Sequence, residues 1–203
     1  MDFIDLREVR HARATRLFGS GWGNVLRYPR IAGVDGYLQS VPPIPREFLE
    51  PDPEFPLLVL VDVRPGLDRC CALAGVSVSG DQSFHPSVPD WVTADEFDKP
   101  YWILCNDGRS NRARSPRFNT TDFCRERGVA GLQAHEGLFL AIQHPSTVDD
   151  NVLDLVGSMA SGATTACLGR IFGRLKLTHR QIDCPMDDCG APERKIDRRL
   201  RSA

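Results

Sequence analysis

The chain has 203 residues, of which 41% are hydrophobic and 26% are charged, and its net charge is −2. These values are typical of one globular domain with a substantial core, and they exclude a chain that is basic as a whole. The longest apolar run, Phe55–Val63, is shorter than the ~18–20 residues that cross a bilayer, and the N-terminal residues mix acids with arginines, unlike a signal peptide. We therefore expect a cytoplasmic protein with no membrane partner.

The first half of the chain predicts one helix, a proline-rich strap and one strand. Apolar residues at helical spacing predict a helix from Asp2 to about Phe18, which ends at the glycines of residues 19–23. Six prolines in Val41–Pro56 forbid a long helix, so we expect an irregular strap with at most one helical turn near Pro45–Glu50. The run Phe55–Val63 predicts a buried central strand. A short helix over Gly66–Ala74 and a mainly irregular segment from Ser77 to Asp98 follow.

The second half predicts a buried helix followed by hairpins. Tyr101–Cys105 predicts a strand that runs into a turn at residues 106–108, and Thr121 is a suitable N-cap for a short helix over Asp122–Arg127. Gln133–Gln143 predicts a helix that ends at His144-Pro145 and is apolar almost all round, so other elements should surround it. The short runs 163–172, 174–178 and 181–184 then indicate an antiparallel meander.

Helices early and hairpins late indicate an α+β fold with a mainly antiparallel sheet and packed helices. We expect one domain over residues 1–190 and a basic C-terminal tail over residues 191–203, because the tail contains Arg194, Lys195, Arg198, Arg199 and Arg201.

A resemblance to a known family covers mainly residues 132–190. The segment Leu132–Ser158 contains Glu136-Gly137 on a helix, His144-Pro145 at its end, the polar connector Asp149-Asp150-Asn151 and the turn Gly157-Ser158. In this order of features the chain resembles an uncharacterised bacterial family of about 200 residues, a domain of unknown function of actinobacterial and candidate-phylum type. The resemblance implies the fold and a C-terminal hairpin, but it implies no activity.

An arginine-rich loop is the first candidate binding site. Arg109, Arg112, Arg114 and Arg117 lie within nine residues that contain no acid, and guanidinium groups suit phosphate or carboxylate recognition. The loop therefore predicts binding of a polyanion such as RNA, DNA or a phosphate ligand. Against this prediction, arginine outnumbers lysine 22 to 3 in the whole chain, a bias that a GC-rich genome also produces.

The candidates for a metal site are His179, Cys184 and Cys189, which could hold zinc if a fourth ligand came from elsewhere in the chain. A plain turn with two thiols is the alternative, and no other cofactor is expected. His135-Glu136 does not complete a zinc-protease motif, because Phe139 stands where the second histidine is required. The other five of the seven cysteines are expected to be packing residues.

The chain contains no nucleophile elbow, phosphate loop or dinucleotide fingerprint. Acids and bases are segregated, since residues 31–99 carry 12 acids against 4 bases. The leading hypothesis is therefore a non-catalytic binding or adaptor protein that docks to a protein partner or to itself. One alternative is the polyanion binder, with nucleic acid as a partner. The other is a hydrolase or transferase with a pocket formed by Asp62, Asp107, His144 and a cysteine.

Overall fold

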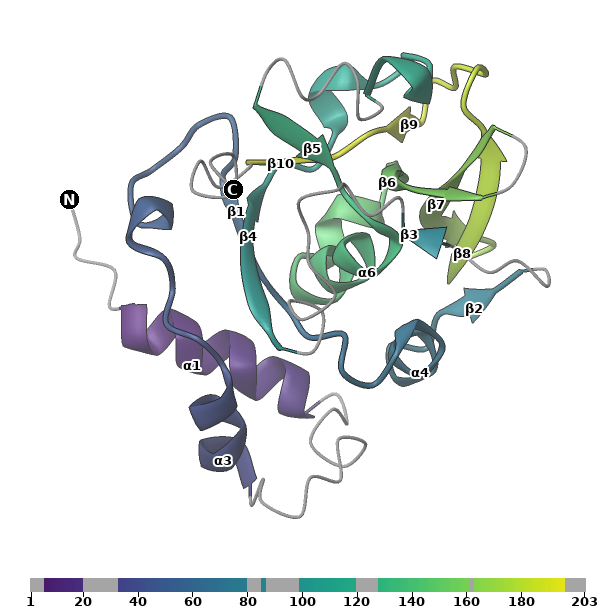
Figure 1. The fold of residues 1–203 in the computed structure, drawn as a ribbon. Helices are drawn as coiled ribbons and strands as arrows, with labels where there is room; N and C mark the ends of the chain where they lie inside the picture. Colours follow the sequence, from purple (N-terminus) through teal and green to yellow (C-terminus); the bar gives the residue numbers. More distant parts are fainter. Residues whose placement is uncertain are drawn as a thin grey trace.

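A computed structural model describes residues 6–19, 33–79, 85–86, 99–119, 128–160 and 163–195. In this part of the chain, four α-helices and two mainly antiparallel sheets form one α+β architecture, which confirms the predicted fold class (Figure 1). The helices are α1 (Leu6–Leu17), α3 (Gly33–Ser40), α4 (Leu67–Leu73) and α6 (Ala134–Gln143). None of the described helices has the length and apolarity that crossing a membrane requires.

The first sheet consists of β1 (Leu57–Val61), β4 (Tyr101–Cys105), β10 (Glu193–Lys195) and β5 (Val129–Gly131), in the order β1-β4-β10-β5. All its strand pairs are antiparallel. The strand predicted over Phe55–Val63 is present and buried, but its predicted central place is wrong, because β1 lies at the edge of this sheet. Its burial comes from helix α6, which packs against it.

One side chain of α6 occupies the hydrogen-bonding edge of β1. Gln143 Oε1 accepts a hydrogen bond from Leu60 N–H (N···O 3.1 Å), and Gln143 Nε2 donates to Leu60 O (2.7 Å). The Gln143 amide thus takes the place of one residue of a neighbouring strand. Leu60 needs such a partner, because its main-chain N–H and carbonyl groups are buried at the edge of the sheet.

The C-terminal residues complete the first sheet. Strand β10 lies between β4 and β5, and Ala191 and Glu193 are only 2% and 3% exposed. The boundary predicted at residue 190 is therefore too early, because residues 191–195 belong to the folded domain. The rest of the predicted tail lies outside the described residues.

The second sheet has the order β2-β8-β7-β6-β3, with β9 paired to β6. Its strands are β2 (Ser77–Val78), β3 (His85–Pro86), β6 (Val152–Ala160), β7 (Thr164–Ile171), β8 (Arg174–Gln181) and β9 (Cys189–Gly190). The predicted meander is confirmed in β7 and β8, which form a hairpin with continuous antiparallel register. Strand β6 was not predicted, and the turn expected at Gly157-Ser158 lies within it. The third predicted run, 181–184, is not a separate strand, since β8 ends at Gln181.

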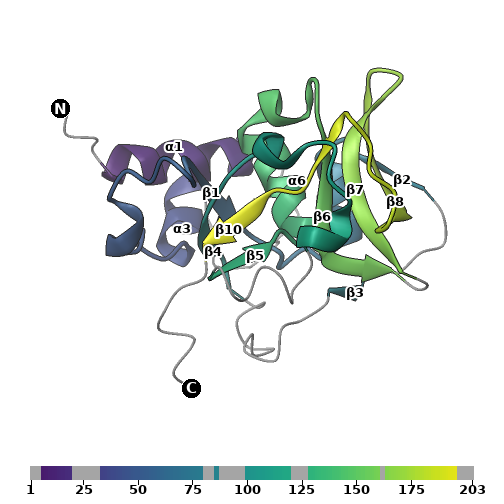
Figure 2. The same cartoon turned by 90° about the horizontal axis from the view of Figure 1, so that it is seen from above.

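Helix α6 lies between the two sheets and contacts β1 on one side and β6 and β7 on the other (Figures 1 and 2). Nine of its ten residues are buried, so the predicted enclosure of this helix is confirmed. Gly137 allows the closest approach: a Cβ there would lie 2.2 Å from Leu155 Cδ2 on β6. The helix ends at His144, before Pro145, as predicted.

The proline strap is irregular apart from the single 3-10 turn Arg46–Phe48, in agreement with the sequence. Arg13 and Arg16 of α1 donate to the main-chain oxygen of Gln143, which ties the N-terminal helix to the end of α6. Three further 3-10 segments are Arg109–Asn111, Pro116–Asn119 and Pro145–Val148. The helix predicted over residues 122–127 and most of the segment 77–98 lie outside the described residues.

Candidate functional site

The arginine loop, residues Arg109–Arg117, is held rigidly on the C-terminal segment. Asn111 is 7% exposed; its amide donates to Ala191 O (2.7 Å) and accepts from Ala191 N–H (2.8 Å). Gly108 has a φ of +75°, and a Cβ there would lie within 2.7–2.9 Å of main-chain atoms of residues 190–192. The position therefore requires glycine.

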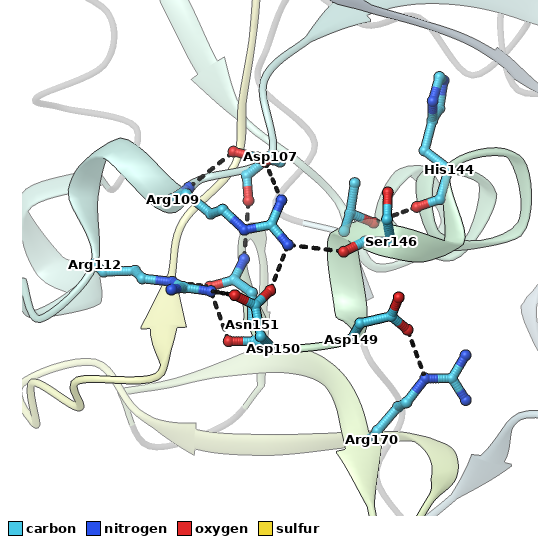
Figure 3. A network of polar contacts seen from close by, with 10 residues as sticks. Asp107, Arg109, Arg112, His144, Ser146, Asp149, Asp150, Asn151 and Arg170 are labelled. Carbon is cyan, nitrogen blue, oxygen red and sulfur yellow. Dashed lines mark hydrogen bonds and ion pairs between the residues drawn. The ribbon is translucent and has the colours of Figure 1, made fainter.

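Two of the candidate arginines share one carboxylate (Figure 3). Arg109 forms ion pairs with Asp107 and Asp150 and donates to Ser146 O (2.7 Å). Arg112 donates from Nε to Asn151 Oδ1 (2.9 Å), and its Nη2 lies 3.3 Å from Asp150 Oδ2. These arginines hold the pKa of the Asp150 carboxyl below its usual value. The acids lie outside the loop in sequence, so the loop sequence alone overstates its positive charge.

The remaining two candidates differ from each other. Arg117 pairs with Asp183 through both Nε and Nη2, and this pairing lowers the pKa of Asp183. Arg114 is exposed and forms no ion pair with any residue that the structure describes. Three of the four guanidiniums are thus matched by acids, and one is available to a ligand. A polyanion would have to displace these aspartates, which weakens the case for the loop as a phosphate-binding site.

The structure does not assemble the predicted metal site. Among the described residues, no group of three or more histidines, cysteines or acids is arranged to hold a metal ion. His179 lies on β8 and Cys189 on β9, with β7 and β6 between these strands in the sheet. Cys184 lies exposed beyond the end of β8, whereas Cys189 is buried. Strand order therefore separates residues that are close in sequence.

The predicted hydrolase pocket is not assembled either. Asp62 is fully buried, accepts from Tyr37 Oη (2.8 Å) and forms a bidentate pair with Arg64. The ring of His144 points away from the Asp107–Arg109 pair, and its Nε2 lies 3.3 Å from Leu58 O (Figure 3). Asp62 follows Leu58 by four residues, so at the usual rise of a strand its main chain lies roughly 13 Å from that of Leu58. His144 contacts Leu58 O, so the histidine and Asp62 do not share one pocket in the predicted way.

Four buried cysteines of the described segments are poorly suited to supply a reactive thiol to such a pocket. Burial raises the pKa of the Cys70, Cys71 and Cys167 thiols to about 12, and it also raises that of Cys105. A thiol with a raised pKa is a poor nucleophile, because only the thiolate attacks. Cys70, Cys71, Cys105 and Cys167 are buried, as expected for packing residues, and Cys124 lies outside the described part of the chain.

A buried polar cluster beside α6 was not predicted. The Tyr101 hydroxyl lies 2.8 Å from His135 Nε2 and donates to Glu136 Oε1 (3.2 Å), and Arg194 Nε lies 3.1 Å from the same oxygen. Because a hydroxyl has one proton, His135 then donates to Tyr101 through Nε2–H. Glu136 Oε2 also accepts from Gln133 N–H (2.8 Å), which makes Glu136 part of a capping box at the start of α6. The only sequence signal was His135-Glu136 at the helix start.

The most exposed apolar feature of the described residues is the tip of the β7–β8 hairpin, residues Arg170–Lys176. Ile171 pairs with Arg174, which leaves Phe172 and Gly173 as a two-residue turn. Phe172 is 102% exposed, and its φ is +52°. A non-glycine residue with positive φ is uncommon, and such hairpin turns prefer asparagine and glycine. The turn therefore holds a bulky ring in water at a cost in backbone energy.

No family model, no curated protein and no solved structure matches this chain significantly, so the resemblance over residues 132–190 stays a prediction.

Proposed function

We propose that this chain is a non-catalytic binding protein of the cytoplasm that docks to its partner through the tip of the β7–β8 hairpin. The single observation that carries this proposal is Phe172, whose side chain is fully exposed on a turn that disfavours it. Exposed aromatic side chains in an apolar and basic setting are typical anchors of protein interfaces, where phenylalanine and arginine are enriched.

The surroundings of Phe172 support an anchor. Ile171 is 39% exposed beside it, and two basic residues of the hairpin, Arg174 and Lys176, form no ion pair with a residue that the structure describes. Basic side chains around an apolar anchor favour approach to an acidic partner and improve selectivity. The arginine loop is less suited to this role, because aspartates of the same molecule already pair with Arg109, Arg112 and Arg117.

The cysteines support the cytoplasm as its compartment. Six of the seven lie in the described part of the chain as free thiols, which is typical of proteins in a reducing environment.

Site-specific photocrosslinking tests the proposal. Benzoylphenylalanine at position 172 should form a discrete adduct in the native host. The matched control carries the same group at Met186, which is 47% exposed on another turn. If position 172 gives no adduct, or only the adducts that position 186 gives, the proposal is wrong.

A further inference from the structure

The hairpin tip presents an apolar and basic face on one side of the sheet. Ile171 and Arg174 are register partners, and Lys176 follows Arg174 by two residues, so the three side chains share this face. Neither Arg174 nor Lys176 forms an ion pair with a residue that the structure describes. Arg170 differs, since it faces the other side and lies 3.3 Å from Asp149. The face that carries Ile171 therefore keeps two basic side chains available to a partner.

A complementary face lies on the strap, in the segment Leu49–Glu54, which we call the acidic strap segment. Leu49 is 38% exposed, and the exposed residues that follow it are two acids and two prolines: Glu50, Pro51, Pro53 and Glu54. Glu50 and Glu54 form no ion pair within the described part of the chain. The segment thus offers proline rings together with two carboxylates, those of Glu50 and Glu54, that form no ion pair with a described residue.

Asp52 fixes the shape of the acidic strap segment. It lies 2.8 Å from Lys195 Nζ and accepts hydrogen bonds from the main-chain N–H groups of Glu54 and Phe55. Prolines at positions 51 and 53 restrict the same backbone further. A segment held in this way loses little conformational entropy when a partner binds.

The strap and the β7–β8 hairpin lie on opposite sides of the molecule in both views (Figures 1 and 2). The two faces therefore cannot meet within one chain. We propose that the hairpin tip of one copy docks on the acidic strap segment of a second copy, which places Phe172 on the proline rings and Arg174 and Lys176 beside Glu50 and Glu54. This inference rests on the proposed function, since it names the partner of the same hairpin.

The chemistry of the two faces matches. Proline-rich segments are recognised by aromatic side chains, because the proline rings form a stiff apolar surface. Opposite charges around that contact set its orientation and make it sensitive to salt. Because the two faces differ, the contact is heterologous, and each copy that docks leaves one hairpin and one strap available for the next copy.

Sedimentation velocity tests the inference on the full-length protein. The contact is small, so we expect association between about 10 μM and 1 mM, with a weight-average sedimentation coefficient that rises with concentration. Raising the salt from about 50 mM to 500 mM should weaken this association several-fold. Phe172→Asn should weaken it roughly tenfold or more, as expected for an aromatic anchor. Met186→Ser is the matched control and should associate like the wild type.

Complementary variants test the geometry. One chain carries Phe172→Asn and keeps its strap, and the other carries Leu49→Ser, Glu50→Gln and Glu54→Gln and keeps its hairpin. At a concentration at which the wild type associates, each variant alone should associate at least tenfold more weakly, whereas the mixture should form a 1:1 complex that does not grow further. All substituted side chains are exposed, so both variants should fold, and circular dichroism checks this.

Two results would overturn the inference: a monomeric wild type over the whole concentration range, or a mixture that forms no complex. Neither result would affect the proposed function if position 172 still crosslinks to a different protein. Conversely, the absence of any adduct at position 172 together with a monomeric wild type would reject both.

Discussion

The contact between Gln143 and Leu60 gives the sharpest stability prediction. Leu60 is fully buried on the edge strand β1, and the Gln143 amide satisfies both its N–H and its carbonyl group. In Gln143→Met, a side chain of similar length replaces the amide, while the main-chain oxygen of residue 143 keeps its bonds from Arg13 and Arg16. The substitution therefore removes the partners of two buried polar groups and little packing.

The expected cost follows from these two groups. A buried donor or acceptor without a partner costs about 1–3 kcal/mol, so the loss of partners for two such groups in Gln143→Met should lower the free energy of unfolding by about 2–6 kcal/mol. At an m-value of roughly 2–3 kcal/mol/M, the urea midpoint should fall by about 1 M or more. The Leu60 amide should also lose protection in hydrogen exchange.

Gln181→Met is the control, because Gln181 is exposed at the end of β8. It should change the free energy of unfolding by less than about 0.5 kcal/mol. A loss below about 1 kcal/mol in Gln143→Met, with normal protection of the Leu60 amide, would refute the reasoning. The edge of β1 would then not depend on the side-chain amide.

Three further predictions concern the turn, the histidines and the arginine loop. Phe172→Asn should raise the free energy of unfolding by about 1 kcal/mol and Tm by about 2–4 °C, because asparagine tolerates positive φ and no burial is lost; a lower Tm would show that the ring stabilises the fold. Burial lowers the pKa of His135 and His144 below 6.5, so the unfolded chain takes up protons first, and stability should fall as the pH drops from 7.5 to about 5.5. Urea melts check this prediction, and a slope that persists after both residues are changed to glutamine contradicts it. Fluorescent RNA at about 50 mM salt should show no anisotropy change that depends on the arginine loop, because aspartates pair with three of its arginines; salt-sensitive binding that Arg112→Ser and Arg114→Ser abolish would restore the polyanion hypothesis.

The sequence by itself determined the local elements of this protein. Proline spacing predicted the strap, because proline restricts its own backbone whatever surrounds it. The apolar residues of Gln133–Gln143 and the proline after His144 predicted both the enclosure and the end of α6. These features depend on neighbours in sequence, so local patterns contain the information.

Only the tertiary structure decided which distant residues meet. Strand β10 inserts between β4 and β5, and β1 lies at an edge, because sheet order depends on contacts between segments far apart in the chain. The same contacts pair Arg109 with Asp150 and Arg117 with Asp183, which no local pattern indicates. The exposure of Phe172 was equally hidden, since an apolar residue in a strand-like run is expected to be buried. Its position in a two-residue turn depends on the register between β7 and β8.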